Sequence, residues 1–393
     1  MSRSLAPNCR EIKAKDGRRA DDIGEMSACT GPCAASNERG TVIESLAGLD
    51  LSIERRGLVL SPDGDPSERE GVLNPASART RDGALMLYPR AVAQGNISRV
   101  GRLIVIPKAE GFEVARDGFA LEPEAEYEIR PHPGFGCEDP RVTFVPAIDR
   151  YVMAYTAFGA PGPRIAVALS QDAITWERLG LMRFERPGMS TGDDKDAAFF
   201  PEPVLSPSGE RCLAFYHRPM LHISALDGRA AIPIIERLPY QDRESIRIGY
   251  VPLEPVMRDI QALLDVSESV LVLSPNDDWG SIKIGSGTPP VRIREGWMSL
   301  YHAVDLIDNS GSRPKFRYSA GVVVHDIERP DRVLYRSPRP VLSPSTGREL
   351  TGTVDNVVFP TAIDPRADLG ERVFDIYYGM ADYSIGAARM TLH

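Results

Sequence analysis

The sequence predicts an all-β fold built from many short strands. Short apolar runs rich in β-branched and aromatic residues recur from Leu58 onward between clusters of Gly, Pro, Asp and Asn, a pattern typical of strands joined by turns. Only residues 255–264 have the pattern of a helix. Segments that begin at Val100, Arg164 and Tyr318 repeat the order strand, polar turn, strand. We therefore expect a β-propeller of about five or six blades, with a two-domain β-sandwich as the alternative.

The expected strands follow one another along the chain at short intervals. They cover residues 85–88, 100–106, 142–145, 151–155, 165–168, 212–216, 270–273, 297–301, 320–324, 357–359 and 374–378. Residues 1–45 are polar and charged and show no sustained periodicity, so we expect them to be a flexible leader. Residues 46–393 then form the propeller domain.

The composition excludes several classes of protein. The chain has 393 residues, of which 42% are hydrophobic and 26% charged, as in ordinary globular proteins. No apolar run approaches the roughly 20 residues that span a bilayer, and the N-terminus lacks the apolar core of a secretory signal. The five scattered cysteines predict no disulfide framework, and we expect a cytoplasmic protein. A net charge of −9 argues against a nucleic-acid partner, and Cys29 and Cys33 lack the second ligand pair of a zinc site.

One short stretch, Gly136–Arg141, combines two carboxylates, a proline and an arginine. Because Pro140 disfavours a helical residue before it, we expect Asp139 to be extended at a loop-to-strand boundary, aimed into a cleft. Neighbouring charge and burial can move the pKa of such a carboxylate, as a general acid requires. A structural turn with an Asp–Arg ion pair explains the hexapeptide equally well.

Polar side chains also follow several expected strands. Arg90, Arg218, His302 and Asp382 each come after an apolar run, whereas Lys283 stands in a Gly- and Pro-rich loop and Lys195 between two aspartates. Each alone is more typical of a surface or turn residue. If the strands converge on a propeller axis, however, these side chains share one pocket that holds an acid, a polar lining and cations. The loop of Lys283 lacks the Gly-Lys-Ser/Thr ending of a nucleotide-binding P-loop.

Together these motifs resemble glycoside hydrolase family 130, a family of β-mannoside phosphorylases and β-mannosidases with five-bladed β-propellers. The resemblance extends from about residue 72 to the C-terminus, with the motifs in the family's order. They are Asn74-Pro75-Ala76, Arg90-Ala91, Ser98 to Gly101, Gly136 to Thr143, Lys195 to Ala197, Phe200 to Glu202, His217 to Pro219, Lys283 to Gly285, Gly296-Trp297, Tyr301-His302, Asn356 to Pro360, and Tyr377 to Gly379 with Asp382.

The resemblance implies roles for single residues. It makes Asp139 the general acid, which delivers its proton through a sugar hydroxyl. The residues implied to line the sugar pocket are Asn74, Arg90, Arg99 and Asp382. Those implied to hold inorganic phosphate are Lys195, Arg218, Lys283 and His302. The implied reaction is inverting phosphorolysis of a β-mannoside to α-mannose 1-phosphate, with phosphate as co-substrate and no metal or organic cofactor.

Two other functions remain open from the sequence. A β-mannosidase of the same family would place carboxylates where Lys283 and His302 stand, and a non-catalytic sugar-binding propeller would not need Asp139 beside a cation cluster. The chain departs from the family pattern at Cys137, Thr288 and Met380 and in a longer segment over 225–270. The linkage, the acceptor sugar and the formation of a homo-oligomer are not decided by the sequence.

Overall fold

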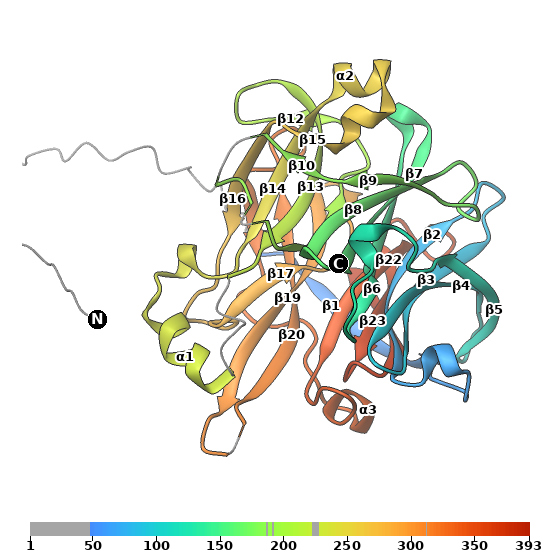
Figure 1. The fold of residues 1–393 in the computed structure, drawn as a ribbon, viewed down its shortest axis with the longest axis vertical. Coiled ribbons are helices and arrows are strands. Elements are labelled where there is room, and N and C mark those ends of the chain that lie inside the picture. Colours follow the sequence, from blue (N-terminus) through green and yellow to red (C-terminus); the bar gives the residue numbers. More distant parts are fainter. Residues whose placement is uncertain (1–47, 186–187, 191, 222–227, 312) are drawn as a thin grey trace, which may run out of the picture. The chain divides into compact units, whose positions relative to one another are not determined.

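The fold is all-β, as the sequence predicts (Figure 1). The computed structural model describes residues 48–185, 188–190, 192–221, 228–311 and 313–393. The expected leader and the Cys29–Cys33 pair lie outside these ranges. Each strand expected from the sequence overlaps a strand of the structure.

The strands of the described residues form five consecutive groups of four antiparallel strands. Short strands accompany them: β10 (Arg183–Phe184), β12 (Val204–Leu205), β15 (Asp265–Val266) and β18 (Val291–Ile293). The groups, in chain order, are β2 (Gly71–Arg79), β3 (Leu85–Ala93), β4 (Ile97–Pro107) and β5 (Phe112–Leu121); β6 (Phe135–Val145), β7 (Arg150–Gly159), β8 (Gly162–Ser170) and β9 (Glu177–Leu181); β11 (Asp194–Phe199), β13 (Arg211–Pro219), β14 (Ile246–Pro252) and β16 (Glu268–Leu273); β17 (Lys283–Ser286), β19 (Gly296–Asp308), β20 (Lys315–His325) and β21 (Val333–Arg336); β22 (Val358–Pro365), β23 (Val373–Met380), β24 (Ser384–Leu392) and β1 (Leu51–Leu60).

The last group is completed by β1, the first strand of the described residues. Strand β1 pairs antiparallel with β24, from Leu51 opposite Leu392 to Leu60 opposite Ile385. The first and second groups are joined into one eight-stranded sheet by a short parallel pair of β4 and β6, in which Ser98 lies opposite Gly136. The leading strand of each group is its first strand in the order given above. These leading strands are neighbours, because β2 contacts both β6 and β22, and β11 contacts both β6 and β17.

Buried apolar clusters join each group to the next. Tyr88 of β3 and Tyr155 of β7 belong to one cluster, Val152 of β7 and Phe215 of β13 to the next, and Tyr216 and Trp297 to a third. A fourth cluster joins β19 and β20 to β23 and β24, and a fifth joins β23 and β24 back to β2, β3 and β4. The apolar core is therefore divided among the contacts between consecutive sheets.

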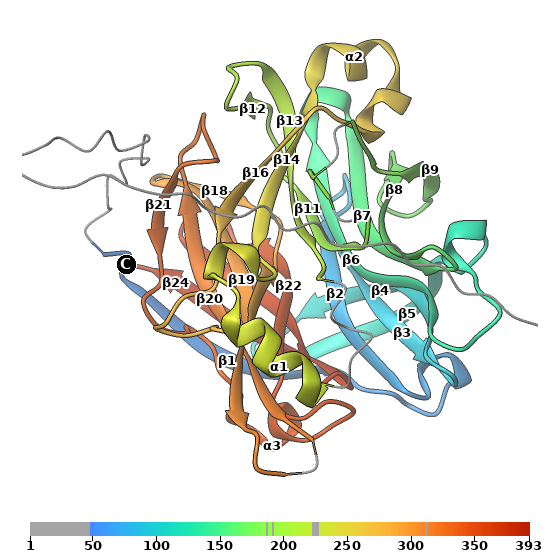
Figure 2. The same cartoon turned by 60° about the vertical axis from the view of Figure 1, so that its left-hand side comes forward.

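Three α-helices are present in the described residues: α1 (Gly228–Arg237), α2 (Leu253–Arg258) and α3 (Gly347–Leu350). The helix predicted over 255–264 is interrupted at Asp259, whose extended backbone separates α2 from a 3₁₀ turn at Ile260–Leu264. Helix α1 was not predicted, because Pro233 lies inside it. Helix α3 was not predicted either, because it has only four residues. Helices α1 and α3 lie at the end of the molecule away from α2 (Figure 2). None of the helices described has the length and apolar composition needed to cross a membrane.

The close approach of β4 and β6 predicts that Gly136 cannot be replaced. A Cβ atom there would lie 2.1 Å from the Ser98 carbonyl oxygen, and the residue has a φ of 126°. Gly136→Ala should therefore lower the free energy of unfolding by about 2 kcal/mol or more. Gly347→Ala is the control, because nothing lies within 4 Å of its added Cβ. Denaturant unfolding that shows equal losses for both variants would contradict this account of the sheet junction.

Candidate active site

Three side chains of the site are placed by bulges in the leading strands. Asn74, Asp139 and Asp196 have φ values of 43°, 46° and 59°, and each stands at a register shift, in β2, β6 and β11 respectively. Asn and Asp tolerate this left-handed conformation better than other side chains, and a bulge redirects its side chain. The extended conformation predicted for Asp139 is wrong, because the bulge places this residue in the left-handed region within β6.

Asp139 is held by an amide and a cation. The Asn74 side-chain amide donates to Asp139 Oδ1 over 2.9 Å, and an Arg90 guanidinium nitrogen lies 3.4 Å from the same oxygen. Arg90 also donates to Ser98 Oγ and to Asn96 Oδ1, over 2.9 and 3.1 Å. Asn74, Arg90 and Asp139 therefore form one hydrogen-bonded cluster, in which Asn74 and Asp139 are buried.

Glu138 connects this cluster to the first of the predicted phosphate-binding residues. One of its carboxylate oxygens accepts from Arg90 over 2.9 Å, and the other accepts from Lys195 Nζ over 3.0 Å. Glu138 is only 2% exposed, so its carboxylate is shielded from water while the two cations are partly exposed. The ammonium of Lys195 is thereby fixed on the side of Arg90.

Arg141 ties the site to β17. Its guanidinium is fully buried and donates to the main-chain oxygens of Gly287, Ser286 and Asp139 over 3.0, 3.3 and 2.8 Å. It also lies 3.7 Å from a carboxylate oxygen of Asp196. The same arginine thus connects the backbone of Asp139 with the end of β17 and with Asp196.

The second half of the site is organised by Asp196. Its Oδ2 accepts from Arg218 Nε over 2.7 Å and lies 3.7 Å from His302 Nε2. Arg218 is also hydrogen-bonded to the Glu244 carboxylate, which in turn accepts from the backbone N–H of Leu221. Asp196 thus connects Arg218 with His302, two of the residues expected to hold phosphate.

Lys283 and Asp382 differ from the other charged residues of the site. Among the described residues neither takes part in an ion pair or a side-chain hydrogen bond. The ammonium of Lys283 lies 5.8 Å from the centroid of the Tyr318 ring. Asp382 stands in a turn after β23 with a φ of 49°, and it interacts electrostatically with Asp139, Arg90, Lys195 and Lys283.

The two carboxyl groups at the centre of the site have opposite pKa shifts. Burial alone would raise the pKa of Asp139, but the charges of Arg90, Arg141 and Lys195 and the hydrogen bond from Asn74 outweigh it and lower that pKa. Burial, reinforced by the charge of Asp139, raises the pKa of Asp382 to about 6. Environments that separate the pKa values of two neighbouring carboxyls are typical of acid–base sites.

His302 is not the cation that the sequence suggested. Its burial lowers its pKa to about 3, more than the charge of Asp196 can offset. Its ring therefore stays neutral at physiological pH, and its Nδ1 lies 3.2 Å from the Ser286 carbonyl oxygen, within hydrogen-bond distance. His302 can serve an anion as a hydrogen-bonding group but adds no charge.

Arg99 is the one predicted site residue that the structure does not bring into this network. In the pairing of β3 with β4, Arg90 lies opposite Val100 and Ala91 opposite Arg99, so Arg99 projects from the other face of the sheet. Its partners are Glu122, over 3.1 Å, and the ring of Phe119.

Sequence reasoning missed the carboxylates that pair the cations. Glu138 and Asp196 stood inside recognised motifs, but nothing in the spacing showed that they neutralise Lys195 and Arg218. Glu244 lies in the longer segment of 225–270, where no motif pointed to it. A charge count of the motifs would have suggested such partners, because buried cations need them.

A further hydrogen-bonded set lies beneath Lys195. His217 bonds Asp194 through Nδ1 and Ser269 through Nε2, both over 2.8 Å. This is the order of groups in a serine hydrolase triad, but Asp194 and His217 are 1% and 0% exposed. Asp194 also accepts from the backbone N–H of Lys195 over 3.0 Å. The set therefore holds β11, β13 and β16 together and fixes the backbone that carries Lys195.

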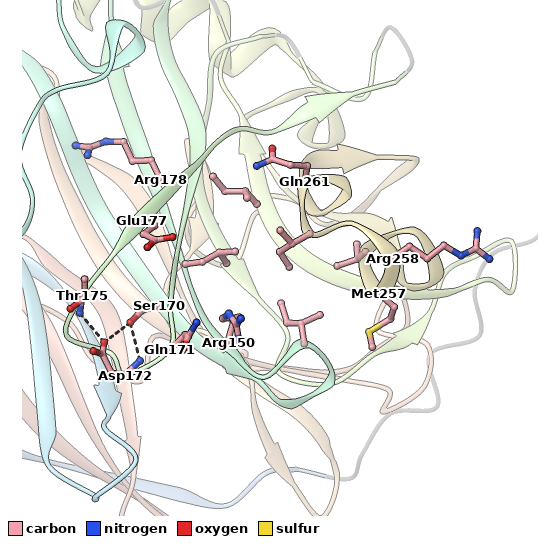
Figure 3. Close-up of a pocket in the computed structure, with 15 residues that line it drawn as sticks. Arg150, Ser170, Gln171, Asp172, Thr175, Glu177, Arg178, Met257, Arg258 and Gln261 are labelled. Carbon is pink, nitrogen blue, oxygen red and sulfur yellow. Dashed lines mark hydrogen bonds between the residues drawn. The ribbon is translucent and has the colours of Figure 1, made fainter.

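Two cavities of the structure differ in their relation to the predicted site residues. One of about 650 Å³ lies between β8, β9 and α2, lined by Arg150, Gln171, Glu177, Met257 and Gln261 among others (Figure 3), and it contains none of the predicted site residues. A smaller one of about 160 Å³ is bounded by Glu244, Lys283, Tyr318 and the apolar face of α1.

In the described part of the chain, no three His, Cys, Asp or Glu side chains are grouped so that they could hold a metal ion.

Comparison with known proteins identifies the family. The family model described as β-1,4-mannooligosaccharide phosphorylase, that of glycoside hydrolase family 130, matches residues 53–251 and 262–393. A 1,2-β-oligomannan phosphorylase of Thermoanaerobacter sp. (strain X514) is 29% identical over 332 residues, which are 82% of this chain and 90% of that protein. A β-1,4-mannooligosaccharide phosphorylase of Ruminococcus albus is 39% identical over 121 residues, 31% of this chain and 34% of that protein.

Solved structures agree in fold. The β-1,2-mannobiose phosphorylase of Listeria innocua in complex with β-1,2-mannobiose superposes with a TM-score of 0.63 at 20% identity, over 86% of this chain and 96% of that one. The fold and the matches place the chain among carbohydrate-active enzymes of the glycoside phosphorylase type. It belongs to glycoside hydrolase family 130.

The neutral state of His302 predicts how stability changes with pH. Its pKa falls from an ordinary 6.5 to about 3 in the folded protein, so between these values the unfolded state binds more protons. Stability should therefore be lost as the pH falls through this window, by about 1 kcal/mol per pH unit from this group. His302→Gln should flatten the decline measured by denaturant unfolding between about pH 4 and 7. The exposed His132, replaced by Gln, is the control, and equal slopes for wild type and His302→Gln would refute the assignment.

Proposed function

We propose that the protein catalyses the inverting phosphorolysis of a β-mannoside and releases α-mannose 1-phosphate. Asp139 is the general acid and inorganic phosphate is the nucleophile. The observation that carries the proposal is the group of cations Lys195, Arg218 and Lys283 next to the Asn74–Arg90–Asp139 cluster. The phosphorylase names of the relatives from Thermoanaerobacter and Ruminococcus support it.

The two halves of the site have separate tasks in this reaction. Asn74, Arg90 and Asp382 bind the hydroxyls of the mannose unit whose bond is cleaved, and Asn74 and Arg90 also orient Asp139. Arg99 has no part, because it projects from the other face of its sheet. Asp139 transfers a proton to the departing oxygen through a sugar hydroxyl.

The cations replace the base of an inverting glycosidase. Such an enzyme uses a second carboxylate to activate water on the opposite face of the sugar, whereas phosphate is already a nucleophile and needs only to be bound and aimed. Arg218 can contact two phosphate oxygens and Lys195 and Lys283 add point charges. His302 donates or accepts a hydrogen bond as a neutral ring.

A β-mannosidase of the same family is the second candidate. The observation that favours it is the Glu244 carboxylate, which is bonded to Arg218 at the place where phosphate would bind. A carboxylate in that position can activate water instead. The ammonium of Lys283, which forms no ion pair with the residues that the structure describes, favours phosphate, and we therefore prefer the phosphorylase.

The strand groups and the free cysteines bear on the architecture of the protein and on its location. We infer that the five strand groups are the blades of a five-bladed β-propeller spanning residues 46–393, because each apolar cluster joins one group to the next and β1 completes the last. Cys137 and Cys212 are free and buried, which agrees with an enzyme of a reducing cytoplasm.

The products formed with and without phosphate test the proposed function. Purified enzyme incubated with β-1,2-mannobiose, β-1,4-mannobiose or mannosyl-glucose should give α-mannose 1-phosphate only when phosphate is present, with saturation as phosphate is added. Asp139→Asn should lower turnover roughly 10²–10⁴-fold, the usual contribution of a general acid. Steady release of mannose at a rate that does not depend on phosphate would establish the mannosidase instead. The absence of any product would favour a sugar-binding protein without catalytic activity.

Lys283 should determine the affinity for phosphate. Lys283→Ala removes a charge-assisted contact, so the Michaelis constant for phosphate should rise about ten- to a hundredfold, and that for the mannoside much less. Turnover should fall as well, because the nucleophile is aimed less well. Lys108→Ala is the matched control, since Lys108 forms a surface ion pair with Glu113 over 2.8 Å. An unchanged phosphate dependence in Lys283→Ala would remove this residue from the phosphate site.

A further inference from the structure

Helix α1 and the strands β17, β19 and β20 border the cavity of about 160 Å³ (Figure 2). Lys283 of β17 and Glu244 are the charged residues among those described along its walls. The other lining residues are apolar or aromatic and include Ile232 and Ile235 of α1 and Val304 of β19. The cavity therefore joins two charged groups of the site to an apolar wall that α1 provides.

Glu244 connects this cavity with the cations proposed to bind phosphate. Its carboxylate accepts from Arg218 and from the backbone N–H of Leu221. Its own main-chain oxygen accepts from the backbone N–H of Ile284 over 3.0 Å, one residue after Lys283. Glu244 is thus held between Arg218 and Lys283, and the cavity adjoins the side of the site from which a nucleophile would attack.

The wall that α1 contributes is one face of the helix. Ile232 is 2% exposed and Ile235 is partly buried, and residues three positions apart lie on the same side of a helix. Ile234, on the other side, is 40% exposed and does not line the cavity. The helix therefore turns its apolar face to the cavity.

Arg243 fixes the end of α1 against the site. Its guanidinium donates to the main-chain oxygens of Glu236 and Leu238, each over 3.0 Å, and to that of Ser281. Glu236 is in the last turn of α1, Leu238 follows it, and Ser281 stands two residues before Lys283. Arg243 is only 9% exposed. One buried side chain thus ties the helix to the strand that carries Lys283.

The composition of the cavity favours one nucleophile over another. A buried water molecule needs two to four polar partners, and the apolar face of α1 provides none opposite Glu244. Phosphate needs no partner from that face, because Lys195, Arg218 and Lys283 can hold it through charge-assisted hydrogen bonds. Apolar surroundings also strengthen the attraction of these cations for an anion.

We propose that the apolar face of α1 keeps water from being held and activated at Glu244, so that phosphate is the nucleophile that reacts. Ile232 and Ile235 determine this specificity, and Arg243 is the positioning residue that holds the helix in place. The inference rests on the proposed function, because it requires phosphate to bind at Lys195, Arg218 and Lys283.

The two competing reactions differ in one proton transfer. In both, the bond from the anomeric carbon to the leaving oxygen breaks, and that oxygen takes the proton that Asp139 delivers through the sugar hydroxyl. In hydrolysis a water oxygen forms the new bond and a water proton passes to the Glu244 carboxylate. In phosphorolysis a phosphate oxygen forms the new bond and Glu244 takes no proton.

The test is the ratio of hydrolysis to phosphorolysis. β-1,2-Mannobiose and β-1,4-mannobiose are each supplied to the enzyme, and mannose release in phosphate-free buffer is divided by α-mannose 1-phosphate formation at saturating phosphate. Ile232→Ser and Ile235→Ser place a hydroxyl in the apolar wall and should raise this ratio about three- to tenfold, the effect of one hydrogen bond on an equilibrium. The matched control, Ile234→Ser on the exposed side of α1, should keep the wild-type ratio.

The positioning role of Arg243 is tested by the same ratio. Arg243→Gln should raise it as Ile235→Ser does, without a change in the Michaelis constant for the mannoside, and Arg243→Lys should restore part of the wild-type ratio. Arg237→Gln is the control, because Arg237 is exposed at the end of the same helix. A wild-type ratio in Arg243→Gln would overturn the positioning role.

The combination of Ile235→Ser with Glu244→Gln identifies the base. The additional mannose release should disappear in this double variant, and its persistence would overturn the inference that Glu244 activates the water. A wild-type ratio in Ile235→Ser would overturn the role of α1 and leave the proposed function intact. If Ile232→Ser does not fold, the partly buried Ile235 decides alone. Mannose release by the wild-type enzyme that does not depend on phosphate would instead overturn the proposed function.

Discussion

The buried guanidinium of Arg141 is the constraint on which the active site depends. It lies between β6, β11 and β17, and the main-chain oxygens of Asp139, Ser286 and Gly287 surround it. Taking a guanidinium out of water is costly unless each donor finds a partner, and burial does lower its pKa against the charges of Asp196 and Asp139. Because those partners come from separate strand groups, the arginine is satisfied only when the groups are in register. The geometry of Asp139 is therefore a product of the whole assembly and not of its own turn.

The fold was predictable because each strand carries its own local signal. Runs such as 151–155 and 297–301 are apolar, β-branched or aromatic and are bounded by turn residues, so they needed no knowledge of their neighbours. The left-handed conformation of Asp139 was not predictable in this way. Pro140 restricts the residue before it but does not select between an extended and a left-handed backbone, and only the pairing of β6 with β7 requires the bulge.

The residues of the candidate site were easier to predict from the sequence than their charges and pKa shifts. Arg90, Arg218 and Asp382 follow apolar runs, and the family motifs added Lys195 and Lys283 to them. The structure brings the five side chains into one electrostatic network. Their protonation states depend on burial and on partners from other strands, which a sequence does not display. His302 shows the consequence, since a histidine after an apolar strand looks like a cation until its burial is known.

The pairing of β1 with β24 has a consequence for the order in which the chain can fold. Leu51 and Leu392 face each other across the same sheet, so β1 can pair only after β24, more than 300 residues later in the chain, has been synthesised. Until then β1 exposes an open hydrogen-bonding edge with apolar residues such as Val59 and Leu60, and such edges promote aggregation. Contacts of this sequence separation also slow folding. The groups between these two strands can form their sheets earlier, but the last group is complete only when β24 pairs with β1.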